Sequence, residues 1–272
     1  MSHPEQDFQA AIAAAGLEPP ESIEPGRWYK FPGYQKSSKN KAAWCFMFDD
    51  MRGGVFGDFS SDMESSWQAS TAVPYTEAER VAHRERVKAM QRQREGDLAQ
   101  RQQLAATDAR TRWAAAKPCT HHDYPTLKGI QPHGARIEGD KLLIPMRDTA
   151  GTVHSLQTIA PDGTKMFMSG GRVKGCYFGI GKPKGALIVC EGFATGASIH
   201  ECTGHAVAVA FNAGNLEAVA VALRTKYPDL KIIIAADDDH QTPGNPGLTK
   251  ATAAAQAAGG VLAVPVVKEL AA

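Results

Sequence analysis

The sequence predicts an α/β protein in which the C-terminal third forms a four-stranded parallel sheet with helices on both faces. Apolar runs of strand length alternate with alanine-rich helical stretches over residues 185–272. A charged run without proline predicts one long helix within residues 76–117, and aromatic residues cluster ahead of it. We therefore divide the chain into four segments, which are residues 1–72, 73–117, 118–184 and 185–272.

Residues 1–72 predict a small β-rich module behind an N-terminal helix. Phe8, Ile12 and Ala15 recur at helical spacing, and alternation over residues 44–48 indicates a strand, with a turn at residues 52–54. Aromatic side chains in such a module usually form its core. They can also stack on the bases of single-stranded nucleic acid, and both interpretations stay open.

Residues 73–117 predict a charged linker helix. Thr76 and Glu79 form a capping box at its start. Apolar positions are sparse along this run, and Gly96 is its one glycine. A helix of this composition is typical of a semi-rigid spacer between domains.

Residues 118–184 predict an α+β subdomain, because short strands alternate with turns. Residues 141–146 and 153–159 flank a turn at residues 148–151 and indicate a β-hairpin. Two further strand-like runs, residues 165–168 and 176–179, flank a glycine-rich, basic loop.

Residues 185–272 predict the order β-α-β-α-β-α-β. The expected strands are residues 186–190, 206–211, 231–236 and 261–265, and helical stretches lie near residues 196–202, 216–226 and 249–258. Ligands of such sheets gather at the carboxyl ends of the strands, so we expect a site there.

The net charge of +1 conceals an uneven distribution. Residues 1–75 and 185–272 carry −4 and −3, whereas residues 76–184 carry +8. A basic centre between acidic ends is typical of a protein that holds a polyanion in one part and metal ions in another, although a solvated helix also collects basic residues.

Composition argues against secretion and against a membrane span. No apolar run approaches the roughly 20 residues that cross a bilayer, and the N-terminus lacks the features of a signal peptide. The five cysteines are scattered without a C-x-x-C pair, which argues against a disulfide framework or a zinc ribbon. We expect a cytoplasmic protein without membrane contact.

Acidic residues follow two of the predicted strands. Glu191 comes directly after residues 186–190, and Asp237 and Asp239 come directly after residues 231–236. Magnesium prefers carboxylate oxygens, and the two aspartates at i, i+2 can converge on one ion that Glu191 shares, unless Glu191 acts as an acid or base. Each acidic strand end alone is ordinary because loops are polar. Together they indicate a metal site.

Several stretches resemble a known family. LIVCEGFATGASI, VAVAFNAGN and IIIAADDD, followed by GNPGLTKATAAAQAAGG, are similar to the TOPRIM domain of bacterial primases, type IA and type II topoisomerases and some nucleases. LLIPMRDTAGTVHSLQTI and KMFMSGGRVKGCYFGIG resemble the segment ahead of TOPRIM in bacterial replicative (DnaG-type) primases. HHDYPTLKGIQPHGARI resembles the lead-in of plasmid- and phage-borne primase-helicases. The resemblance covers residues 118–265 and implies a primase core.

The resemblance also implies roles for individual residues. Glu191, Asp237 and Asp239 match the metal-associated acidic residues of the family, which makes them the implied catalytic residues with Mg²⁺ or Mn²⁺ as cofactor. A second group is implied to face nucleotide or template phosphates, and it consists of Lys165, Lys174, Arg172 and Arg147. A solvated surface charge explains Arg147 equally well.

Two features depart from the family. Its N-terminal zinc ribbon has a counterpart in the layout of residues 26–67, but Cys45 is the sole cysteine there, so no zinc is expected. Template recognition is then left to aromatic and basic side chains. Relatives also continue to another acidic motif and a helicase-binding or helicase domain, whereas this sequence ends at VKELAA. We expect either a truncated form or a minimal protein whose helicase is a separate chain.

The sequence therefore predicts a primase-like nucleotidyltransferase of phage or plasmid type. It would join ribonucleoside triphosphates into short RNA primers on single-stranded DNA, with a replicative helicase as a further partner. One alternative is a TOPRIM nuclease that uses the same carboxylates. The other is a non-catalytic DNA-binding module that assists replication, and magnesium binding lost in Asp237→Ala would argue against it.

Overall fold

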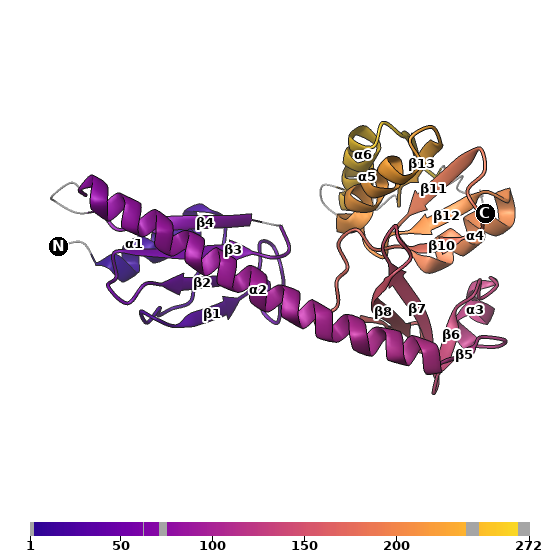
Figure 1. The fold of residues 1–272 in the computed structure, drawn as a ribbon, viewed down its shortest axis with the longest axis horizontal. Coiled ribbons are helices and arrows are strands. Elements are labelled where there is room, and N and C mark those ends of the chain that lie inside the picture. The colour runs from indigo at the N-terminus through magenta and orange to yellow at the C-terminus, as the bar shows by residue number, and fades with distance from the viewer. Residues whose placement is uncertain (1–2, 62, 71–74, 238–244, 266–272) are drawn as a thin grey trace, which may run out of the picture. The chain divides into compact units, whose positions relative to one another are not determined.

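The computed structural model describes residues 3–61, 63–70, 75–237 and 245–265 (Figure 1). It divides the chain into two compact units, residues 1–96 and 97–272. Each unit has its own hydrophobic core, and the helix α2 (Glu77–Ala115) contributes side chains to both. The long helix expected from the charged run is thus present, but it packs at both ends and is not exposed throughout.

The first unit is an antiparallel sheet with a helix on each face. It consists of α1 (Pro4–Ala14), β1 (Trp28–Phe31), β2 (Ala43–Met47), β3 (Gly53–Asp58), β4 (Met63–Gln68) and the first part of α2, with the strands in sequential order. Successive side chains of a strand point to opposite faces. Cys45 and Met47 therefore pack with Phe8 of α1, while Trp44 packs on the other face with Val87 and Met90 of α2.

Most aromatic side chains of this unit are core residues, as the simpler interpretation expects. Trp44 is buried, and the guanidinium of Arg94 from α2 lies 3.6 Å above its ring. Trp28 and Phe59 differ, because 45% and 61% of their surfaces stay exposed beside the same arginine. The module therefore has a core and, in addition, an exposed aromatic edge.

The turn expected at residues 52–54 lies earlier, at residues 49–52. Gly53 and Gly54 are already the first residues of β3, paired with β4. A β-carbon at Gly54 would lie 2.8 Å from the Phe8 ring. The glycine is therefore required by close packing against α1, and not by a turn.

The second unit begins with the C-terminal part of α2 and an antiparallel sheet. This sheet has the order β5 (Lys117–Pro118), β6 (Arg136–Glu138), β7 (Lys141–Arg147), β8 (Val153–Ile159) and β9 (Lys165–Phe167), and α3 (Asp123–Lys128) lies between β5 and β6 in sequence. Leu143 and Leu156 pack with Ala109 of α2 on one face. Leu142 and Met146 face the opposite way.

The C-terminal sheet has five strands in the order β10 (Phe178–Ile180), β12 (Ala206–Val209), β11 (Ala186–Cys190), β13 (Lys231–Ala235) and β14 (Val261–Ala263). The four strands expected to be parallel are parallel, and β10 adds an antiparallel fifth strand beside β12. The sheet therefore has five strands, where the sequence predicted four. The helices are α4 (Phe193–Thr203), the 3₁₀ turn η1 (Ala213–Asn215), α5 (Leu216–Lys226) and α6 (Pro246–Ala257).

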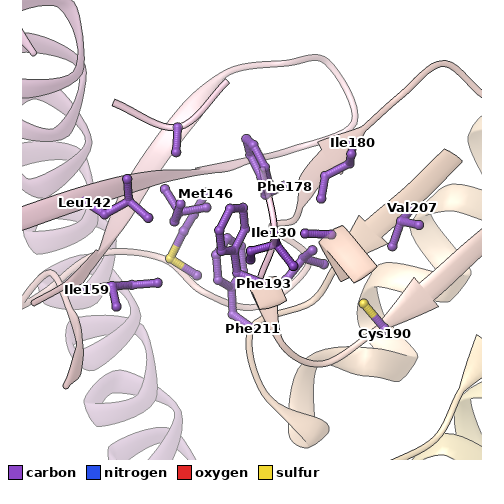
Figure 2. Close-up of a cluster of buried hydrophobic side chains, with 14 of the residues drawn as sticks. Ile130, Leu142, Met146, Ile159, Phe178, Ile180, Cys190, Phe193, Val207 and Phe211 are labelled. Carbon is purple, nitrogen blue, oxygen red and sulfur yellow. The ribbon is translucent and has the colours of Figure 1, made fainter. Parts of the chain in front are cut away.

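The two faces of the C-terminal sheet pack differently. Val189 and Ile234 face α5 and α6, whereas Ile188 and Cys190 face α4 and the preceding antiparallel sheet. Figure 2 shows this second core, in which Leu142, Met146 and Ile159 meet Phe178, Phe193 and Phe211. The shared core fixes the antiparallel sheet against the C-terminal sheet.

Among the described residues, no helix is both long enough and apolar enough to cross a membrane.

Candidate active site

Two carboxylates lie at the same edge of the C-terminal sheet. Glu191 directly follows β11, and Asp237 lies two residues beyond β13. The two strands are parallel neighbours in which Val189 pairs with Ile234, so their carboxyl ends stand side by side. Both acidic side chains are half-buried.

The charges of both carboxylates act on the thiol of Cys190. Burial raises the pKa of this thiol, and the negative charges of Asp237 and Glu191 raise it further. The parallel pairing of β11 with β13 places Glu191 and Asp237 at the same edge of the sheet, where the sequence predicts them.

The donor set suits a hard cation. Glu191 and Asp237 offer carboxylate oxygens, the ligands that magnesium prefers. Asp239, the third predicted ligand, lies outside the described residues. Within the described part of the chain, no group of three or more His, Cys, Asp or Glu side chains could hold a metal ion. Two of the three predicted metal ligands are thus placed at the edge, and these two fit the ion.

The four predicted phosphate-binding residues lie on three segments of the second unit, which are β7, β9 and the loop between β9 and β10. Lys165 lies on β9 with its Nζ 5.7 Å from the centre of the Tyr124 ring. Lys174 is exposed in the loop between β9 and β10. Arg172, in the same loop, approaches the Asp148 carboxylate at 3.7 Å, and its Nε donates to Cys176 Sγ.

Arg147 is held by contacts within its own hairpin and with α2. Its guanidinium donates to the carbonyl of Gly151 at 2.9 Å and lies 5.6 Å from the centre of the Trp113 ring. Burial lowers its pKa, and the nearby charge of Arg136 lowers it further. These contacts give Arg147 a role in the β7–β8 hairpin whether or not it meets a phosphate.

A buried asparagine ties the Lys174 loop to the carboxylate edge. Asn215 is 3% exposed, and its Oδ1 accepts from the main chain of Gly175 at 2.8 Å. Its Nδ2 donates to the carbonyls of Cys176 and Ala210 at 2.9 and 2.8 Å. The Ala210 amide in turn donates to the Cys190 carbonyl, directly before Glu191.

Sequence reasoning did not identify Asn215 as a site residue. An asparagine directly before a helix is typical of an N-cap. The side chain of Asn215 makes no capping bond to α5, however, and it serves a segment 40 residues earlier. The position of Asn215 directly before α5 thus predicts helix capping, whereas the side chain binds the Lys174 loop.

Parts of this chain are similar to a known domain family and to curated proteins. Residues 186–271 match the model of the Toprim domain family. Two curated proteins of Escherichia coli, both named DNA primase TraC, are 44% identical to the chain over 151 and 155 residues. These matches cover 51% and 53% of this chain but only 14% and 11% of the relatives' own lengths.

Two solved structures are more distant. The primase fragment of the bacteriophage T7 primase-helicase protein is 17% identical, with a TM-score of 0.40, and the match covers 56% of this chain and 70% of that chain. The DnaG primase catalytic domain bound to single-stranded DNA is 10% identical, with a TM-score of 0.45, over 64% of this chain and 74% of that one. These values are too low for the two structures to inform the site.

Proposed function

We propose, from a Toprim domain in a chain homologous to DNA primases, that this protein synthesises short RNA primers on single-stranded DNA. The observation that supports this most directly is that Glu191 and Asp237 follow two neighbouring parallel strands, at the edge to which the Lys174 loop is tied. Carboxylates and basic side chains brought together in this way suit the transfer of a nucleotidyl group.

The carboxylates would form the metal site. Glu191 and Asp237, with Asp239, would hold Mg²⁺ or Mn²⁺. When bound, the ion would lower the pKa of the attacking 3′-hydroxyl group and offset the charge that develops on the phosphates. The partial burial of both carboxylates favours this role, because a lower local dielectric strengthens their attraction for a cation.

The basic side chains would position the nucleotide and the template. Lys174 and Lys165 would donate to phosphate oxygens, and Arg172 would do so by exchanging its contact with Asp148. Arg147 would support the hairpin that carries Asp148. Because Asn215 holds the main chain next to Lys174, that lysine would meet the phosphates at a fixed distance from the metal site.

The first unit would bind the template. Trp28 and Phe59 are exposed beside Arg94, and residues 25–48 contain five basic residues and no acidic one. Exposed aromatic rings next to positive charge are the combination that binds single-stranded nucleic acid. Ribonucleoside triphosphates, a DNA template and a replicative helicase complete the proposed set of partners, in the cytoplasm of a plasmid- or phage-bearing cell.

A primer synthesis assay tests the proposal. Purified protein would be given mixed-sequence single-stranded DNA, labelled ribonucleotides and Mg²⁺ or Mn²⁺. We expect short RNA products that fall about a hundredfold or more in Asp237→Asn and in Glu191→Gln, because each change removes a charge from the metal site. Asp229→Asn, which is exposed beyond the opposite end of β13, should leave synthesis unchanged.

The same reactions separate the alternatives. If the template is shortened and no new product appears, the protein would be a nuclease and not a primase. Intact DNA that binds in a salt-dependent manner, with no product at any metal concentration, would leave a non-catalytic replication module.

A further inference from the structure

The edge strand β9 exposes two large apolar side chains that point to opposite faces. Phe167 is 41% exposed and Met166 is 63% exposed. In the pairing with β8, Phe167 lies opposite Gln157, Met166 opposite Thr158, and Lys165 opposite Ile159. Directly paired residues share a face of the sheet. Lys165 and Phe167 therefore share the face of Ile159, which belongs to the core shared with the Toprim sheet.

Phe167 is connected to the main chain at the carboxylate edge by contacts with Phe211. Its ring contacts the Phe211 ring edge-on, with centroids 6.4 Å apart and planes at 81°. Phe211 ends the segment that follows β12, and its amide donates to the Glu191 carbonyl at 2.8 Å. Phe211 is among the buried side chains of the core in Figure 2. Phe167 thus lies one ring contact and one hydrogen bond from Glu191.

The backbone of Phe211 is strained. Its φ of 73° lies in the left-handed region, which bulky side chains rarely adopt. Such strain persists where the surrounding structure imposes it, and it concentrates at functional sites. The strained backbone of Phe211 places its ring against one edge of the Phe167 ring. Much of Phe167 stays exposed to solvent.

We propose that Phe167 is a stacking platform for the base of a nucleoside triphosphate whose phosphates lie at the edge formed by Glu191 and Asp237. The inference rests on the proposed function, which places phosphates at that edge. Aromatic stacking accepts every base, because each base has a π-face. Phe167 offers no hydrogen-bonding group, so the platform would hold all four nucleotides alike, as copying a mixed template requires.

The charges around Phe167 favour a nucleotide as the occupant. Lys165 shares its strand and its face, and Arg172 and Lys174 follow in the next loop. On the other side of the chain of contacts, Glu191 directly follows β11, and its main-chain carbonyl accepts from the Phe211 amide. A triphosphate and its metal ion would therefore lie between the carboxylates and the basic side chains, with the base toward Phe167.

The test is a fluorescence titration of the full chain with 2-aminopurine riboside triphosphate and Mg²⁺, without template. Stacking on an aromatic ring quenches this base. We expect quenching by the wild type, about tenfold weaker binding in Phe167→Ala, equivalent to about 1.4 kcal/mol, and retained binding in Phe167→Trp. Met166→Ala is the matched control, because Met166 is the exposed neighbour on the opposite face. Both positions are exposed, so neither variant should unfold the protein.

Three results would overturn the proposal. The first is equal binding by Phe167→Ala and Met166→Ala. The second is no quenching by the wild type. The third is that Phe167→Ala weakens the binding of a 2-aminopurine oligodeoxynucleotide but not the binding of the triphosphate. That result would assign the platform to the template.

The primer assay keeps this inference separate from the proposed function. A protein that makes primers but binds the probe equally with and without Phe167 would retain the function and lose the platform. A protein that binds the probe through Phe167 but makes no primers would retain the platform and lose the function.

Discussion

At the scale of single residues, Asn215 does the most to organise the site. Its amide satisfies three main-chain groups from two separate segments, the loop that carries Lys174 and the end of β12. A buried amide with all of these bonds formed is stabilising, but a partner left without its bond is costly. Asn215 is therefore a point at which a small change would affect both stability and the position of Lys174.

We predict that Asn215→Ala destabilises the second unit by about 2–3 kcal/mol, because it leaves Gly175, Cys176 and Ala210 without their buried partner. Urea unfolding would measure the loss. Asn212→Ala is the control, since Asn212 is half-exposed in the same segment and should cost within about 0.5 kcal/mol. Equal losses in the two variants would contradict the role given to Asn215.

Cys45 and Cys190 are poorly suited to act as metal ligands or nucleophiles. Burial raises the pKa of Cys45 to about 12 and raises that of Cys190, to which two carboxylates also contribute. A thiol acts on metals and electrophiles as a thiolate, so both residues are core side chains at neutral pH. Cys45 in particular packs with Phe8 and Met47 in the core of the first unit.

At the scale of elements, the sheet of the first unit uses its two faces for different purposes. The face that packs on α1 is a closed core. The other face is covered only in part by α2, where Arg94 lies over Trp44 and leaves Trp28 and Phe59 exposed at its sides. The exposed aromatic edge is thus formed by the packing of a basic helix on an aromatic sheet.

Trp28→Ala and Phe59→Ala should each weaken the binding of single-stranded DNA by about 1–3 kcal/mol, because each removes one stacking surface. Fluorescence anisotropy with a labelled oligonucleotide at several salt concentrations would measure the change. Met51→Ala removes an apolar side chain of the same unit that is about as exposed as Trp28, and it should have no effect. An unchanged affinity in both aromatic variants would place template binding elsewhere.

At the scale of the whole molecule, the chain consists of two units with separate cores. Phe8, Cys45 and Met47 belong to the first, and Leu143 and Leu156 belong to the second. Because no hydrophobic cluster among the described residues mixes side chains from both units, their stabilities should be set separately.

Met47→Ala should destabilise the first unit and Leu156→Ala the second, each by about 2–5 kcal/mol, because both side chains are fully buried. Hydrogen exchange measured on peptides from each unit would locate the loss. Faster exchange in both units of either variant would show that the two cores unfold together.

The order of elements could be predicted from the sequence because it depends on local pattern. Alternating apolar and helical stretches predicted β11 to β14 and α4 to α6, and the proline-free charged run predicted α2. The sequence also placed Glu191 and Asp237 at one edge, because the carboxyl ends of parallel strands meet at the same side of a sheet.

Tertiary structure alone decided the contacts between distant segments. No local pattern specifies the partners in three of these contacts. They are the pairing of β10 with β12, the hydrogen bonds of Asn215 to a loop 40 residues earlier, and the contact of the Phe167 ring with the Phe211 ring. The physical reason is that periodicity reports which side of an element is buried, whereas the identity of the neighbour is set by packing across the whole unit. The sequence by itself therefore determined the elements and the acidic edge, and the fold determined which side chains surround that edge.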